Sequence, residues 1–213
     1  MSKSRWIKKY TKLEHLDGIL QHRYLHLGPP QEWDDKNDSE CIRLFSAVRG
    51  GFEIRATCLT EAVDRFHFWH VFGEREKGVC LWFDKVDLLS DVDQDASLVA
   101  GKVQYRTLQN LGTFEPRLLP FLKRSQYRDE QEYRVLRVEA ARKTPPDKFE
   151  FSACSLKRIY LNPWLSVDEV KVEKCKISKL LGNEMHHVSL LQNRTLKYDP
   201  WIKAISVVSN TNS

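Results

Sequence analysis

Two carboxylates and a guanidinium stand at alternate positions near the middle of the chain, as Glu130, Glu132 and Arg134. The segment around them is predicted to be a turn that runs into a strand, and side chains at i, i+2 and i+4 of a strand share one face. Neighbours in this row would lie about 7 Å apart, at roughly 3.3 Å rise per residue. Like charges this close cost stability unless something binds them, so the row is a candidate site. The alternative is the solvated face of an edge strand, where charges prevent edge-to-edge pairing.

Several enzyme classes lack support because their motifs are missing. The chain has no Walker-type phosphate loop, no G-x-G-x-x-G, no G-x-S-x-G elbow and no C-x-x-C pair. His67 and His70 lie three apart on an aromatic-rich segment, but no acidic or sulfur partner stands at zinc spacing. We therefore expect no metal. The aromatic stripe of that segment is either core or a platform for a ligand.

The elements that would position these residues belong to an α+β protein. The segment 78–84 is the most apolar expected strand and should be central in its sheet. Few strand-helix-strand units fall at regular spacing, so we expect a mostly antiparallel or mixed sheet flanked by helices. The other expected strands are 5–10, 24–27, 52–59, 101–106, 149–151, 156–161, 187–191 and 201–208, besides the strand that carries Glu132. The expected helices include 41–48, 62–72, 114–123 and 166–182.

Composition is that of a folded protein with one sizeable domain. The chain has 213 residues, of which 41% are hydrophobic and 30% charged, with a net charge of +5. We expect a single domain over 1–208 and a flexible polar tail over 209–213. The N-terminus has no apolar signal core, and no apolar run approaches the ~20 residues that span a bilayer. The five cysteines are an odd number, and no two of them stand at the spacing of a metal site, so we expect reduced thiols. These features predict a soluble, cytoplasmic protein with no membrane partner.

Four motifs resemble a large, mostly bacterial family called domain of unknown function twenty-nine seventy-one. The first is Lys8-Lys9-Tyr10 followed by Ile19-Leu20, and the second is the acidic loop 33–38, in which Trp33 and Asp35 stand and the family's proline is replaced by Lys36. The third joins Trp69 and Phe72 to the Gly78–Asp84 strand. The fourth is Lys123 with Tyr127–Arg134. The resemblance spans most of residues 5 to 161.

The layout is more distantly similar to ADP-ribosyltransferases, including toxins that modify nucleic acids. This resemblance implies that NAD is a co-substrate, that the acceptor is a nucleic acid or protein, and that the protein is a toxin or antiphage effector with an antitoxin or immunity partner. Cleaving the nicotinamide bond passes through an oxocarbenium-like state that a carboxylate stabilises.

The same resemblance assigns the roles. Glu132 would stabilise the oxocarbenium-like state, and Glu130 would orient or deprotonate the acceptor. The expected NAD-binding residues are Lys9 and Tyr10 at the ribose, Trp69 and Phe72 stacked on nicotinamide, and Lys123 and Arg134 at the pyrophosphate. Trp33 and Asp35 are expected to contact substrate. Phe72 replaces the family's usual tyrosine, which removes a hydroxyl but leaves a ring that can stack.

Two other functions stay open. The chain could be a non-catalytic basic module that binds nucleic acid or protein, with Trp33 and Trp164 stacking on bases. It could also be a metal-dependent nuclease that uses Asp35, Glu130 and Glu132 around magnesium. The most informative structural observation is whether Tyr10, Trp69 and Glu132 line the same cleft. The enzymatic hypothesis fails if Glu132 points to open solvent on an edge strand.

Overall fold

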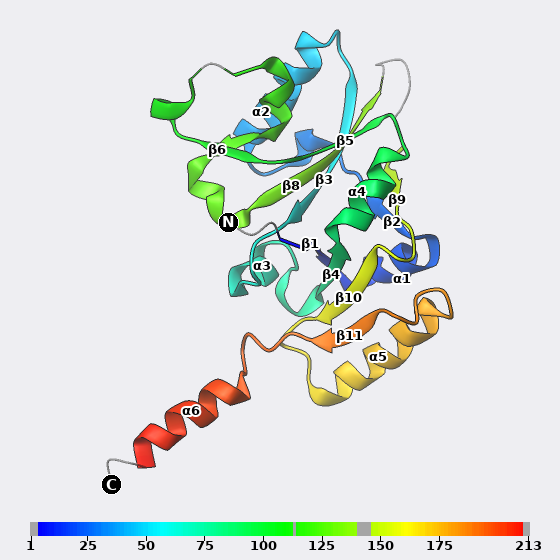
Figure 1. The fold of residues 1–213 in the computed structure, drawn as a ribbon, viewed down its shortest axis with the longest axis vertical. Coiled ribbons are helices and arrows are strands. Elements are labelled where there is room, and N and C mark those ends of the chain that lie inside the picture. The colour runs from blue at the N-terminus through cyan, green and yellow to red at the C-terminus, as the bar shows by residue number, and fades with distance from the viewer. Residues whose placement is uncertain (1–3, 113, 140–145, 211–213) are drawn as a thin grey trace.

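In the computed structural model, which describes residues 4–112, 114–139 and 146–210, most strands join one seven-stranded sheet (Figure 1). Its order is β11-β10-β4-β1-β3-β8-β5, with β10 and β11 parallel and the other neighbours antiparallel. The strands are β1 (Trp6–Lys12), β3 (Glu53–Thr60), β4 (Gly78–Asp84), β5 (Leu98–Lys102), β8 (Glu132–Glu139), β10 (Leu156–Leu161) and β11 (Ser189–Gln192). Two short pairs lie outside this sheet: β2 (Tyr24–His26) with β9 (Lys148–Glu150), and β6 (Gln104–Arg106) with β7 (Leu122–Arg124). The α+β class and the mixed sheet are confirmed.

Strand β4 is an interior strand between β10 and β1, as its apolar composition predicts. Val79, Leu81 and Phe83 are fully buried and alternate with residues of the opposite face. They belong to the main core, to which α1 (Leu13–His22), α4 (Lys85–Asp93) and α5 (Val167–Leu181) contribute from one side of the sheet. Helix α5 begins with the Ser166 capping box and ends at Gly182, as expected from the sequence.

The opposite face of the sheet is covered in two separate places. Helix α2 (Lys36–Val48) packs Ile42 and Phe45 on the outer ends of β3 and β8. The short helix α3 (Phe66–Val71) packs Phe68 and Trp69 near β1 and β4. Between the apolar patches under α2 and α3, neither helix covers this face of the sheet, and polar side chains lie there. No helix among the described residues combines the length and apolar character needed to cross a bilayer.

Three expected elements are wrong. The segment 101–106 is divided between β5 and β6. The expected helix 114–123 is a 3-10 helix, Pro116–Phe121, followed by β7, because Pro120 has no N–H to continue an α-helix. The expected strand 201–208 is part of helix α6 (Asp199–Asn210), whose apolar Trp201, Ile202 and Ile205 follow helical spacing. Figure 1 shows α6 extending away from the sheet. Residues 211–213 of the expected tail lie outside the described residues.

Candidate active site

Strand β8, which carries Glu132, lies inside the sheet between β3 and β5. Glu132 is 4% exposed, so the alternative of a solvated edge strand is wrong. The expected row of three charges is also corrected. Gln131 adopts a left-handed conformation with φ 41°, which separates the strand from the 3-10 helix Ser125–Glu130. Glu132 and Arg134 therefore share a strand face, whereas Glu130 approaches from the preceding turn.

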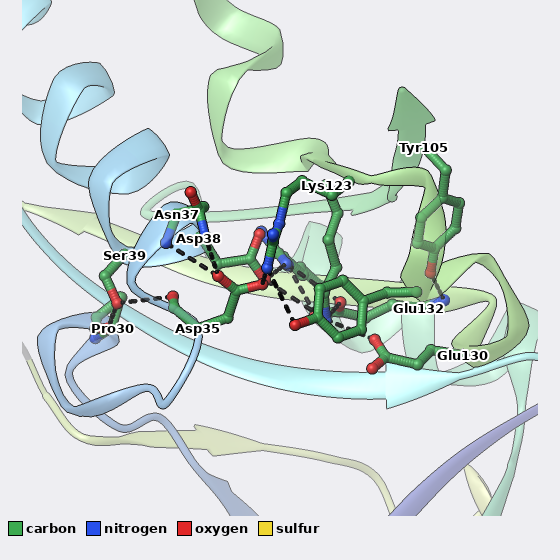
Figure 2. A network of polar contacts seen from close by, with 12 residues as sticks. Pro30, Asp35, Asn37, Asp38, Ser39, Tyr105, Lys123, Glu130 and Glu132 are labelled. Atoms are coloured by element: carbon green, nitrogen blue, oxygen red, sulfur yellow. Dashed lines mark hydrogen bonds and ion pairs between the residues drawn. The ribbon is translucent and has the colours of Figure 1, made fainter. Parts of the chain in front are cut away.

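The central feature is a group of paired charges that we call the carboxylate cluster: Asp38, Glu130 and Glu132 with Lys123 and Arg134 (Figure 2). The Lys123 Nζ lies 2.5 Å from Glu130 Oε2, 2.9 Å from Glu132 Oε2 and 3.4 Å from Asp38 Oδ2. One ammonium therefore contacts all three carboxylates. With every group ionised, the cluster has three negative and two positive charges, so it keeps an excess of negative charge.

Arg134 is the buried support of this cluster. Its side chain is fully buried, and its Nε and Nη2 donate to Glu132 Oε1 at 2.7 Å and Asp38 Oδ2 at 2.7 Å. Its Nη1 donates to the Pro120 carbonyl at 2.8 Å, and its guanidinium lies 5.0 Å from the centre of the Trp33 ring. Every direction of the guanidinium is thus occupied by protein. The expectation that Arg134 meets a pyrophosphate does not fit this placement.

The two glutamates of the cluster have pKa values displaced in opposite directions. Burial alone would raise the pKa of Glu132, but Arg134 and Lys123 outweigh it and lower that pKa to about 2. Burial raises the pKa of Glu130, and Lys123 offsets this only in part. Burial also raises the pKa of Asp38, despite its contact with Arg134. Opposite shifts in a neighbouring pair are typical of acid-base sites.

A cavity of about 610 Å³ opens beside the cluster where β1 and β3 diverge. Within the described residues, these strands share a single pair, Lys8 with Thr60. Beyond it, the edge of β3 pairs instead with Gly28, whose N–H and carbonyl each bond Ala56 at 2.9 Å. The volume lies within the range of roughly 300–1,000 Å³ usual for small-molecule sites.

Eight of the ten predicted site residues line this cavity. They are Lys9, Tyr10, Trp33, Asp35, Phe72, Lys123, Glu130 and Glu132. They come from strands, loops and helix ends that are far apart in the sequence. The cavity therefore joins the first, second and fourth motifs, together with Phe72 of the third.

Trp69 does not line the cavity and is a correction to the expected stacking role. Its side chain is fully buried, and its Nε1 donates to Asp64 Oδ1 at 3.0 Å. The Tyr10 hydroxyl donates to the same oxygen at 2.6 Å, and the Tyr10 ring meets Trp69 edge-on at 5.2 Å. Tyr10 and Glu132 thus share the cleft, and Trp69 supports Tyr10 from behind. Phe72, at 42% exposure, is the aromatic ring of that segment that reaches the cavity.

Lys9 and Asp35 are held by contacts of their own at the cavity wall. The Lys9 Nζ donates to the Cys58 carbonyl at 3.1 Å, and burial lowers the pKa of Lys9. Asp35 is the N-cap of α2, accepting the Asn37 N–H at 2.9 Å, and it pairs with Arg124 at 3.3 Å. Burial opposes these contacts, but together they lower the pKa of Asp35 to about 2. Asp35 therefore serves the fold as well as the cavity.

Two residues of the site were missed by the sequence reasoning. Asp38 was part of the acidic loop, and its place in the first turn of α2 directs its side chain to Arg134 and Lys123. The sequence analysis placed Asp38 in a loop over 33–38 and began the helix near Cys41. The helix in fact begins at Lys36, so the helical position of Asp38 was not recognised. The Tyr105 hydroxyl accepts the Glu132 N–H at 2.8 Å, and no feature of the sequence connects these two residues.

The magnesium site of the nuclease hypothesis has no matching arrangement among the described residues. No group of three or more histidine, cysteine, aspartate or glutamate side chains is placed there to hold a metal ion. Asp35 turns to Asn37 and Arg124, while Glu130 and Glu132 share Lys123.

A scan against protein-family models and searches of curated proteins and of solved structures find no significant match to this chain. The resemblance drawn from the motifs therefore stays a prediction.

Proposed function

We propose that this protein is an ADP-ribosyltransferase-like enzyme that cleaves the nicotinamide glycosidic bond of NAD and transfers ADP-ribose to an acceptor. One observation carries the proposal: Glu130 and Glu132, with pKa values displaced in opposite directions, stand together on the wall of a 610 Å³ cavity. Such a pair can supply one permanent negative charge and one carboxylate that binds a proton more readily than an ordinary glutamate.

Glu132 is the permanent charge. At neutral pH it is ionised, and it lines the cavity from an interior strand. In the proposed reaction the bond between the ribose C1′ and the nicotinamide nitrogen breaks, and nicotinamide leaves with the bonding electrons. The positive charge that develops on the ribose is stabilised by the fixed carboxylate.

Glu130 is the proton acceptor. An oxygen or nitrogen of the acceptor molecule forms the new bond to C1′, and its proton passes to the Glu130 carboxylate. Because burial raises the pKa of Glu130, this carboxylate is a stronger base than an exposed glutamate. It lies at the end of the 3-10 helix, beside the cavity, with 18% of its side chain exposed.

Of the two cations in the carboxylate cluster, Lys123 lines the cavity, whereas Arg134 is fully buried behind the carboxylates. Its ammonium contacts Glu130 and Glu132. A pyrophosphate in the cavity would compete with these carboxylates for Lys123. Binding would then strengthen the negative charge that Glu132 presents to the ribose.

The test is the release of nicotinamide from NAD by the purified protein, with and without cell extract as a source of acceptors. The variants are Glu130→Gln and Glu132→Gln, each of which keeps the shape of the side chain, and the matched control is Glu53→Gln, an exposed residue of β3 that does not line the cavity. We expect both cluster variants to lower the rate by at least about 100-fold and the control to match the wild type.

Circular dichroism would confirm that Glu130→Gln, the less buried of the two changes, remains folded. The proposal fails if the wild type releases no nicotinamide, or if folded Glu130→Gln and Glu132→Gln are as active as the control. An enzyme that consumes NAD or modifies nucleic acid would also slow the growth of cells that express it, as a toxin or antiphage effector does. That growth effect should disappear in Glu130→Gln.

A further inference from the structure

A second cluster of aromatic and basic side chains lies on the same sheet face as the carboxylate cluster. The strand register aligns Lys8 of β1, Trp82 of β4 and Arg158 of β10 in one row, with Trp6 beside them. The centres of the Trp6 and Trp82 rings are 6.2 Å apart. We call the group formed by Trp6, Trp82 and Arg158 the indole surface.

The guanidinium of Arg158 spans both indoles. Its Cζ lies 4.8 Å from the centre of the Trp6 ring and 5.7 Å from that of Trp82. All three side chains are half-buried, so they are fixed by packing and still reach solvent. No hydrogen bond or ion pair joins Arg158 to a carboxylate in the part of the chain that the structure describes. A fixed cation without an anionic partner is suited to an anionic ligand.

Arg158 keeps the indole surface positive, because the neighbouring charges Arg5 and Asp84 pair with each other. The Cζ of Arg5 also lies 4.8 Å from the centre of the Trp6 ring, and 70% of the Arg5 side chain is exposed. Asp84, the partner of Trp6 in the strand register, pairs with Arg5 at 3.0 Å and accepts the Val86 N–H at the start of α4. That carboxylate is thus already satisfied by protein donors.

The indole surface is connected to the cavity by Lys8. This residue lines the cavity, and its Nζ lies 4.6 Å from the centre of the Trp82 ring. Thr60 pairs with Lys8 on one side and with Glu132 on the other, so the cluster and the indole surface belong to one continuous sheet face. A ligand chain that crosses the indole surface is therefore directed toward the cavity.

We propose that Trp6, Trp82 and Arg158 form a binding surface for single-stranded nucleic acid. Unpaired bases stack on indole rings and on guanidinium planes, and phosphates pair with free arginines. A duplex hides its base faces, and an acidic peptide has charge without bases to stack. This binding goes beyond the proposed transfer reaction and does not depend on the carboxylates, so the two proposals can fail separately.

The test is fluorescence anisotropy with labelled single-stranded RNA and DNA of about 16 nucleotides, compared with a duplex of the same length, in the absence of NAD. The key variant is Arg158→Gln, and the matched control is Lys157→Gln, its neighbour on β10, which removes the same charge from a residue that pairs with Asp87. Arg158→Lys separates charge from the stacking of the planar group.

We expect the wild type to bind both single strands more tightly than the duplex, with an affinity that falls as salt is raised. Arg158→Gln should weaken binding about tenfold or more, and Arg158→Lys should recover only part of it, while Lys157→Gln stays near the wild type. Binding should persist in Glu130→Gln. The proposal is overturned if no single strand binds, if the duplex or poly-glutamate binds equally well, or if Arg158→Gln and Lys157→Gln weaken binding equally.

Discussion

On one face of the sheet, Leu81, Phe83 and Val135 are buried beneath α1, α4 and α5 in a continuous apolar core. On the other face, side chains that are equally buried include Glu132 and Arg134. The same strands serve both faces, because successive residues of a strand alternate sides. An apolar face needs only area and shape, whereas each buried charge needs a partner in a defined position. The polar face is therefore where this fold places its cavity and its candidate chemistry.

The largest losses of stability should follow the removal of a buried side chain from either face, for a different physical reason on each. Arg134→Met leaves Asp38 and Glu132 without their shared guanidinium, and we expect a loss of about 3–5 kcal/mol in the free energy of unfolding. Leu81→Ala, a truncation on the apolar face, should cost about 2–5 kcal/mol by leaving a cavity. Urea denaturation followed by circular dichroism would measure both.

Arg134→Lys provides a control that keeps the charge and loses the two-pronged contact. It should lie between the wild type and Arg134→Met. If Arg134→Met were as stable as the wild type, the cluster would contribute nothing to the fold, and the contrast between the two faces would be broken.

The pH dependence of stability should sharpen the contrast, because the buried carboxylates Asp38 and Glu132 lie on the polar side of the sheet. Glu132 has a folded-state pKa of about 2 against an ordinary value of 4.5. A lowered pKa adds stability that is complete above the unfolded value and is lost as the pH falls toward 2. The stability difference between the wild type and Glu132→Gln should thus shrink by on the order of 3 kcal/mol from pH about 5 to 2.

Taking the difference matters because Glu130 and Asp38, whose pKa values are raised, contribute with the opposite sign. Both residues are present in the wild type and in Glu132→Gln, so their pH-dependent contributions largely cancel in the stability difference. A stability difference that stays constant over this pH range would show that the carboxylate of Glu132 is not held by its cations. The difference between the wild type and Leu81→Ala should not vary with pH.

The smallest effect concerns the start of β8. Tyr105→Phe removes the hydroxyl that accepts the Glu132 N–H, and we expect a loss of about 1 kcal/mol. Nicotinamide release should fall more than the stability does, since the backbone that carries the carboxylate is no longer fixed. Tyr198→Phe is the matched control, because Tyr198 is exposed and does not line the cavity. Equal effects of the two changes would argue against a positioning role for Tyr105.

The sequence by itself predicted the α+β class, the interior strand 78–84, the capped helix that ends at Gly182 and the closeness of Glu130 to Glu132. These features depend on local signals: apolar composition, capping residues, and the spacing of charges along one segment. Such signals act between residues that are neighbours in the chain. They can therefore be read without knowing which strands pair.

Only the tertiary structure decided which of the candidate residues meet. Asp38 reaches Arg134 across 96 positions of the chain, and Tyr105 reaches Glu132 across 27. The sequence pattern assigns residues to a face of a strand or helix but does not show which face is covered by another element. Trp69 of α3 and Arg134 of β8, which are fully buried, could therefore not be distinguished from residues that line the cavity. That distinction follows from the divergence of β1 and β3 and from the docking of α2 and α3, which are set by contacts between distant segments.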